Sequence, residues 1–406
     1  IGSLAIAAVT VVLPITFLIS SLGMAIGIGG SSIISRALGA KDKEKAYRTF
    51  GNQIMMTLVL ALFFVVIGFL FSDEILLLFG ANGDIMKPAK EFFIPVLIGV
   101  PFLALCMMGN NVIRAEGKAK FAMMAMIIPA FGNIILDIIF IKFLDMGMFG
   151  AALATTISYF MCFVFILWFF VKKSELKPSL HHYKFDLSIV KEISSLGLVT
   201  FSRQGVVSIL AIIINHTLFT YGGEHSVVVY GIISRMLMFA LFPILGITHG
   251  FLPIAGYNYG AENYNRVKET ISISIKYAAV LATFIFIGIL IFAKPIVSVF
   301  TNDVDVIAET PDALRWVFAA TPIIALQLIG AAYFQAAGKA IPALLLTLSK
   351  QGFFLIPLVL ILPNYFGIFG VWVAFPIADI LSTIITAYFL RREMTTKLIE
   401  KPDGIL

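Results

Sequence analysis

The chain has 406 residues, of which 60% are hydrophobic and 13% are charged, whereas a soluble domain carries roughly 25% charged residues. This composition excludes a soluble globular protein and indicates a membrane protein. The net charge of +6 does not indicate nucleic-acid binding, because the basic residues fall mainly in alternate loops, as the positive-inside rule requires of a membrane protein.

Apolar runs long enough to cross a membrane recur along the whole chain. A helix needs roughly 20 residues to cross about 30 Å of hydrocarbon, and these runs are continuously apolar rather than alternating like the strands of a membrane barrel. The sequence therefore predicts an all-α polytopic membrane protein with eleven spans, near residues 4–35, 50–71, 92–112, 121–143, 148–171, 193–220, 227–256, 271–293, 314–335, 341–362 and 367–390.

The two halves of the chain repeat each other at a fixed offset. Pro101, Gly109 and Gly117-Lys118-Ala119 recur 221 positions later as Pro322, Gly330 and Gly338-Lys339-Ala340. A repeat of six spans enters the membrane twice in the same direction, so we predict two six-helix bundles related as parallel repeats. The same offset leaves the span 193–220 without a counterpart. We therefore expect the first helix of the first bundle to precede Ile1, with eleven of twelve spans in this chain.

The repeat and the charged loops divide the chain into four parts. We predict an N-terminal lobe with five of six helices, a cytoplasmic linker, a C-terminal lobe with six helices and a cytoplasmic tail, at residues 1–171, 172–192, 193–390 and 391–406. The linker contains the adjacent pair His181-His182, which could bind a metal ion. Because no cysteine or carboxylate cluster accompanies the pair in the sequence, we interpret it as part of a solvated linker.

Four glycines stand where predicted spans end in the basic loops: Gly39, Gly117, Gly260 and Gly338. The C-terminus of a helix favours a residue that can adopt positive φ, so we expect these glycines to form turns.

Proline and cysteine also occur within the predicted spans. Pro101 and Pro322 are expected to form a matched pair of helix kinks. Cys106 and Cys162 are expected to pack as apolar side chains without a disulfide.

Asp137 is the strongest candidate for a functional residue. A charged group inside a bilayer costs roughly 2.5–3.5 kcal/mol, so such residues tend to mark ion or substrate pathways. Asn133 lies one helical turn earlier on the same face, and Thr155 on the next span is expected at the same depth. The three could bind a sodium ion through their oxygen atoms, or Asp137 could bind a proton. A structural hydrogen bond between helices is the alternative.

The second half does not repeat this group. It has other polar residues within or at the margins of its spans, namely Lys350, Asp379, Arg203, Gln204 and Arg235, which we predict as a possible polar network. Lys350 and Asp379 could meet near the middle of the membrane as an ion pair, either static or functional. His216 and His249 could titrate near neutral pH, although a lone histidine in a span is more often a packing residue.

Five stretches in the right order carry a resemblance to a known family: ISRALGAKDKEKA at 34–46, IRAEGKAK at 113–120, NIILDIIFI at 133–141, GAALATTIS at 150–158 and PIAGYNYGAENYNRV at 253–267. Together they resemble the multidrug and toxic compound extrusion family of secondary transporters. The resemblance implies two six-helix lobes that face each other across a central cleft. It also implies export of organic cations and other amphipathic compounds in exchange for protons or sodium ions.

The resemblance extends to the candidate site. Asn133, Asp137 and Thr155 match, residue for residue, the Asn, Asp and Thr of the family's N-lobe cation site. That site has a further Asp from the first helix, which we expect in the span before Ile1. Some members carry a membrane-embedded Glu in the seventh helix, but the span 193–220 has none, which argues against a second cation site in the C-terminal lobe.

The sequence therefore predicts a proton- or sodium-coupled efflux antiporter in the cell (inner) membrane, with a cytoplasmic C-terminus. A flippase for lipid-linked precursors, from the related superfamily, is the alternative. No G-x-x-x-x-G-K-[ST] phosphate loop, H-E-x-x-H motif or catalytic triad is found in the sequence, which argues against an ATP-driven pump or an enzyme. We expect small organic cations or drugs and membrane lipids as partners, no nucleic acid, no cofactor, no bound metal other than a coupling sodium ion, and a monomer.

Overall fold

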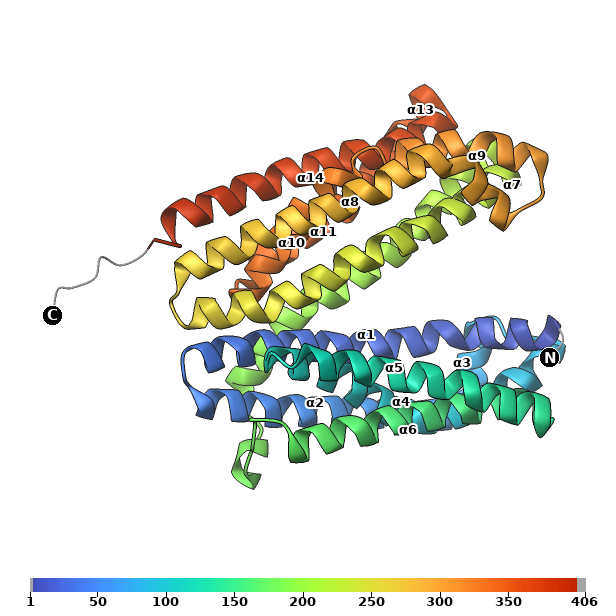
Figure 1. Cartoon of the computed structure of the whole chain (residues 1–406). Helices are drawn as coiled ribbons and strands as arrows, with labels where there is room; N and C mark the ends of the chain where they lie inside the picture. Colours follow the sequence, from blue (N-terminus) through green and yellow to red (C-terminus); the bar gives the residue numbers. More distant parts are fainter. Residues whose placement is uncertain (1–2, 400–406) are drawn as a thin grey trace. The chain divides into compact units, whose positions relative to one another are not determined.

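The computed structural model describes residues 3–399, and this part of the chain is helical almost throughout, without a strand (Figure 1). Within it, 10 helical segments are long and apolar enough to cross a membrane. One of them, α7 (Leu187–Gly260), has 74 residues and is broken at Gly223, where φ is 64° and ψ is −162°. Because the break divides α7 into two spans, the prediction of an all-α polytopic protein with eleven spans is confirmed.

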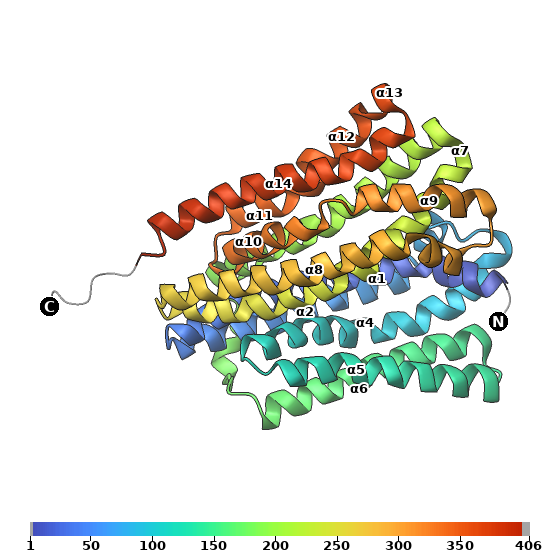
Figure 2. The same ribbon diagram turned by 45° about the horizontal axis from the view of Figure 1, so that its top comes forward.

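The chain forms two compact units that divide between Phe201 and Ser202, within α7. The first unit contains α1 (Ser3–Gly39), α2 (Lys43–Leu70), α3 (Ser72–Leu78), η1 (Gly83–Ile85), α4 (Met86–Ala115), α5 (Ala119–Asp137), η2 (Ile138–Phe143), α6 (Gly147–Lys172), η3 (Leu180–Tyr183) and the beginning of α7. In this unit α4 packs against α1 and α6, and α5 lies beside α6 (Figure 2). Its core includes Val12, Phe93 and Leu97.

The second unit begins with the remainder of α7. It continues with α8 (Tyr264–Phe300), α9 (Val304–Val317), η4 (Thr321–Ile323), α10 (Ile324–Ala336), α11 (Ala340–Leu348), η5 (Ser349–Leu355), α12 (Ile356–Ile361), α13 (Pro363–Phe366) and α14 (Ile368–Thr396). Here α14 packs against α9, α10 and η5. Helix α14 continues six residues beyond the predicted end of the last span at 390, and residues 400–406 of the predicted tail lie outside the described part.

Many large apolar side chains point away from both units. Phe63, Phe131 and Ile212 are 55%, 64% and 70% exposed. In water such a surface would be costly, but in a bilayer the lipid chains cover it. The exposure of these side chains therefore fits a chain that spans the membrane.

The four basic-loop turns confirm the repeat at the level of backbone geometry. Gly117 and Gly338 adopt positive φ, 75° and 78°, and so do Lys41 and Glu262, at 60° and 55°. Each of these residues is the left-handed residue of a Schellman turn: the amide of Gly117 donates to the Arg114 carbonyl, and that of the following residue to the Ile113 carbonyl. The two pairs of turns are related by the same 221-residue offset.

The expectation for Gly39 and Gly260 is wrong. Both glycines end their helices, but the positive φ falls two residues later, at Lys41 and Glu262. The next residues, Asp42 and Asn263, then cap the following helices and accept hydrogen bonds from the amides of residues 45 and 266. The capping side chain fixes where the next helix starts, and this determines which residue takes the left-handed conformation.

The two prolines expected to form matching kinks behave differently. Pro101 lies inside the continuous helix α4, whereas Pro322 lies in η4, the 3₁₀ turn that separates α9 from α10. The helix is thus interrupted at this proline only in the second copy, and a kink at Pro101 stays a prediction.

The two cysteines are free and buried, as expected. Cys106 and Cys162 pack in one cluster with Ile113 and Phe169.

The repeat also places a glycine at a close helix contact in each unit. A Cβ atom on Gly109 would lie 2.8 Å from Cγ2 of Ile166, and one on Gly330 would lie 2.4 Å from Cγ2 of Thr386. Both glycines therefore let two helices approach, α4 with α6 and α10 with α14. Thr386 is fully buried and donates a 2.8 Å hydrogen bond to the Ser382 carbonyl, so its methyl group cannot easily turn away.

We expect Gly330→Ala to lower the melting temperature of the purified protein, because overpacking costs roughly 1–3 kcal/mol. Thr386→Ser, which removes the obstructing methyl group, should restore most of the loss when combined with it. Gly231→Ala is the control, since a Cβ there meets nothing within 4 Å. Thermal unfolding in detergent measures these effects. A Gly330→Ala protein as stable as the wild type would contradict the close contact.

A partly buried glutamate ties the α4–α5 turn to the end of α6. The Glu116 carboxylate accepts hydrogen bonds from the Ser174 hydroxyl and, at 3.0 Å, from the Glu175 amide. Burial raises the pKa of this carboxyl above its ordinary value, and the hydrogen bonds from Ser174 and Glu175 only partly oppose the effect of burial. The folded chain therefore holds this proton more tightly than the unfolded chain.

The raised pKa predicts a pH-dependent term in stability. When a group binds its proton more tightly in the folded chain, the free energy of unfolding falls as the pH rises. The fall begins near the ordinary glutamate pKa, about 4.3, and continues through the raised pKa. In Glu116→Gln this decrease should be absent, while Glu175→Gln, at an exposed neighbour, should retain it. Melting temperatures recorded from pH 4 to pH 8 test this, and identical pH profiles for wild type and Glu116→Gln would refute it.

Candidate functional site

Asp137 lies at a change of helix type within a membrane span. It is the last residue of α5, and the next six residues form η2, a π-helix. Such wider turns are rare and occur frequently at functional sites. The Asp137 side chain is only partly buried, and no hydrogen bond or ion pair links its carboxylate to another side chain among residues 3–399. Its negative charge is therefore uncompensated by the described part of the chain.

Of the other two predicted residues, Asn133 lies on α5 with Asp137 and Thr155 lies on the neighbouring helix α6, but neither is hydrogen-bonded to Asp137. The Thr155 hydroxyl donates to the Ala151 carbonyl of its own helix, at 3.0 Å. The Nδ2 atom of Asn133 is buried without a hydrogen-bond partner in the described residues. This free donor lies one turn before the Asp137 carboxylate on α5, and α5 packs against α6. The three residues therefore line one pair of helices without forming a closed site.

The second unit contains a buried ion pair. Nζ of Lys350, in the π-helix η5, lies 2.5 Å from Oδ1 of Asp379 in α14, and the two side chains are 15% and 4% exposed. The predicted meeting of these residues is confirmed. Each charge is neutralised by the other, so the carboxylate of Asp379 differs from that of Asp137 in having its own counter-ion.

The rest of the predicted network does not assemble. Gln204 and Arg235 are exposed and Arg203 is partly exposed. Within residues 3–399 the side chains of Arg203 and Arg235 form no hydrogen bond or ion pair with another residue. Among the described residues, the predicted C-lobe network is therefore reduced to the pair Lys350 and Asp379.

Sequence reasoning missed a threonine near the ion pair. Thr383 follows Asp379 by one helical turn on α14, and its hydroxyl oxygen is buried without a partner in the described residues. The spacing of four residues could have indicated it. Nothing in the sequence indicated that the buried amide of Gln327 donates to the Leu346 carbonyl at 3.0 Å, joining α10 to α11.

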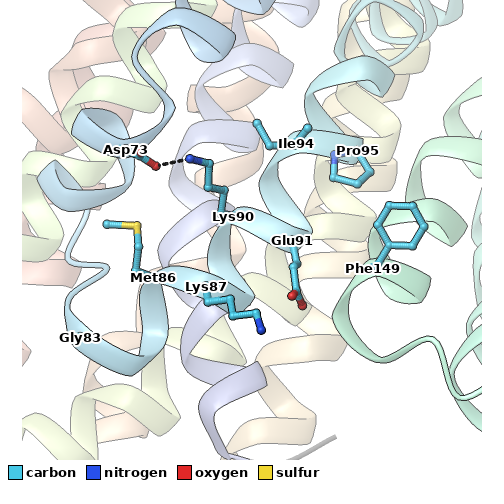
Figure 3. Close-up of a pocket in the computed structure, with 9 residues that line it drawn as sticks. All are labelled: Asp73, Gly83, Met86, Lys87, Lys90, Glu91, Ile94, Pro95 and Phe149. Atoms are coloured by element: carbon cyan, nitrogen blue, oxygen red, sulfur yellow. Dashed lines mark hydrogen bonds and ion pairs between the residues drawn. The ribbon is translucent and has the colours of Figure 1, made fainter.

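A hollow of about 640 Å³ opens beside the first part of α4 (Figure 3). It is lined by Asp73, Gly83, Met86, Lys87, Lys90, Glu91, Ile94, Pro95 and Phe149. Nζ of Lys90 donates to Asp73 at 2.7 Å across it. Its charged groups are of both signs, and its lining does not include Asn133, Asp137 or Thr155, so it is separate from the candidate cation site.

Comparison with known proteins identifies the family of the chain. The family model MatE matches residues 1–139 and 203–361, which together make up more than half of the chain. The chain belongs to the multidrug and toxic compound extrusion (MATE) family. As a MATE protein it is a multi-pass membrane transporter and not an enzyme. One matched stretch falls in each compact unit, as the internal repeat predicts.

Relatives of this MATE protein align along almost its whole length. Multidrug export protein MepA from Staphylococcus haemolyticus is 29% identical over 394 residues, which cover 96% of this chain and 86% of MepA. The solved structure of the MATE multidrug transporter DinF-BH is 39% identical, with a TM-score of 0.88 over 98% of this chain and 90% of that one.

A third relative has a similar fold, but a different function is suggested for it. A MOP superfamily transporter from Pyrococcus furiosus, for which the reverse polarity of the binding pocket suggests a different function, has a TM-score of 0.91. It is 27% identical, and the match covers 98% of this chain and 90% of that one. The MATE fold is thus shared by proteins whose pockets differ.

The buried ion pair predicts an asymmetry between single and double variants. Asp379→Asn should lower the stability of this MATE protein strongly, because breaking a buried pair costs roughly 3–5 kcal/mol, whereas replacing both partners by apolar residues is often neutral. The double variant Lys350→Met/Asp379→Leu should therefore melt closer to the wild type than Asp379→Asn does. Thermal unfolding in detergent decides this, and additive losses in the double variant would contradict it.

Proposed function

We propose that this MATE protein is a secondary active efflux antiporter that exports organic cations or amphipathic drugs in exchange for protons or sodium ions. The observation that carries the proposal is the contrast between its two intramembrane aspartates. Asp379 is neutralised by Lys350 at 2.5 Å, whereas Asp137 has no counter-charge among the described residues. A carboxylate without a counter-ion in an apolar bundle favours binding of a cation.

The chemistry of coupling follows from this free carboxylate. A proton can bind Asp137 directly, and a sodium ion can use its oxygen atoms together with those of Asn133 and Thr155. Coupling then requires that the cation and the drug favour different conformations of the transporter.

The relatives support the substrate class. MepA is a multidrug export protein, and DinF-BH is a MATE multidrug transporter. For this chain we propose small organic cations as cargo, a monomer in the cell membrane, and cytoplasmic basic loops and C-terminus. A lipid-linked precursor flippase is the second candidate, since a transporter of the same fold has a pocket for which a different function is suggested.

We expect Asp137→Asn to abolish export driven by a cation gradient while leaving the fold intact. The amide has nearly the shape of the carboxyl group but neither holds a proton nor carries the charge that attracts sodium. Export of a fluorescent cationic dye from cells, with expression and melting temperature measured in parallel, checks this. Asp145→Asn is the matched control, because Asp145 is an exposed aspartate in the turn after η2 and its replacement should leave export unchanged.

Two results would contradict the proposal in different ways. Normal export by Asp137→Asn would make Asp137 a structural residue. If the wild-type protein in liposomes moved a lipid-linked precursor but no dye under either a proton or a sodium gradient, the flippase would replace the antiporter.

A further inference from the structure

Two histidines and a glutamate of the first unit lie close together outside the predicted membrane spans. None of them belongs to the candidate cation site at Asp137. His181 and His182 lie in the short 3₁₀ helix η3, and Glu44 lies in the first turn of α2, 138 residues before His182. Nε2 of His182 is 3.0 Å from Oε2 of Glu44, and Nε2 of His181 is 3.9 Å from Oε1. The interpretation of the histidine pair as a solvated linker is therefore wrong for His182, which is buried.

The spacing of these atoms matches that of metal ligands. In a tetrahedral zinc site the nitrogen and oxygen ligands lie about 2.0–2.2 Å from the metal, which places them about 3.3 Å from one another. One ligand atom from each of Glu44, His181 and His182 falls within 4.8 Å of the others. The contact of His182 with Oε2 of Glu44, at 3.0 Å, is close to the ideal spacing, and that of His181 with Oε1, at 3.9 Å, is longer.

The backbone holds these ligands in place before any ion binds. The carbonyl of His182 lies directly on Gly51 of α2, where a Cβ atom would come within 2.3 Å of it. The side chain of Asn52 donates to the Lys184 carbonyl at 3.2 Å and accepts from the Asp186 amide at 3.0 Å. The segment that carries the histidines is thus anchored to the helix that carries Glu44.

Both nitrogens of the His182 ring have hydrogen-bond partners. Its Nδ1 atom lies 2.7 Å from the Ser179 amide and 3.2 Å from the Ser179 carbonyl. In the ion-free protein Nδ1 accepts from the amide and Nε2–H donates to Glu44. Binding of a metal at Nε2 requires the ring proton on Nδ1, so the ring must turn Nδ1 from the Ser179 amide towards the Ser179 carbonyl, which lies 3.2 Å away and is the kind of outer partner that metal-bound histidines have.

No basic side chain of α2 competes with a metal ion for the Glu44 carboxylate in the ion pairs that the described residues form. The neighbours of Glu44 in α2 have carboxylates of their own: Lys45 lies 3.2 Å from Glu192, and Arg48 pairs with Asp186. Glu44 and His181 are each 61% exposed, so water can supply a fourth ligand. This set of one carboxylate and two imidazoles with an open position suits a borderline cation such as Zn²⁺.

We propose that Glu44, His181 and His182 form a binding site for a divalent transition-metal ion of the Zn²⁺ type, which fastens the segment between α6 and α7 to α2. This site is independent of the cation that drives transport. It links the segment between α6 and α7 to the start of α2, within the first unit.

The test uses the full chain, purified without a histidine tag, with Co²⁺ as a spectroscopic probe and Zn²⁺ as competitor. We expect one Co²⁺ per chain, an intense visible absorption typical of tetrahedral coordination, and its loss when Zn²⁺ is added. Zn²⁺ should also raise the melting temperature of the wild type. Calorimetric titration with Zn²⁺ gives the affinity.

His181→Ala is the decisive variant because its side chain is exposed and its removal should not disturb the fold. It and Glu44→Gln should weaken Zn²⁺ binding by at least the roughly 10–100-fold that loss of an outer-shell partner causes. His225→Ala is the matched control, since His225 makes a single 3.1 Å contact with Glu309 and should not affect binding. Absence of binding to the wild type, or equal affinity in His181→Ala and His225→Ala, would overturn the proposal.

Discussion

The hydrocarbon of the bilayer is the constraint on which the structure depends. Because it offers no partner to an amide, a carbonyl or a charge, the backbone must form its hydrogen bonds with itself. Every ionised side chain in a span must be neutralised, reach water, or serve to bind an ion or substrate. The chain meets the first requirement with helices throughout residues 3–399. Its two intramembrane aspartates meet the second requirement in opposite ways.

Asp379 and Lys350 form an ion pair inside the second unit, in which each compensates the charge of the other. Asp137 has no such partner among the described residues, and it lies where α5 gives way to a π-helix. A static pair stabilises one conformation, whereas a free carboxylate responds to the cation it meets. The difference between a paired Asp379 and an unpaired Asp137 therefore bears on function more directly than the fold does. A transporter with a different pocket shares that fold.

The duplication separates what is structural from what is specialised. The Schellman turns at Lys41 and Glu262 and at Gly117 and Gly338 recur at the repeat offset with nearly equal φ, and so do the caps that follow the first pair. Gly109 and Gly330 each permit a close helix contact. The polar residues inside the spans are not copied. The shared frame is thus set by helix ends and helix packing, while each unit has its own buried charges.

The sequence by itself determined the spans, the repeat and the family, because apolar length, turn chemistry and short motifs are local properties of the chain. It also indicated that Lys350 and Asp379 could meet, since their depths follow from the rise of a helix. Only the tertiary structure decided which side chains face each other. It left Arg203 and Arg235 outside the network, kept Thr155 bonded to its own helix, and brought Glu44 to His182 across 138 residues. Such contacts depend on how each helix is rotated and on how loops fold back, and neither is set by neighbours in the sequence.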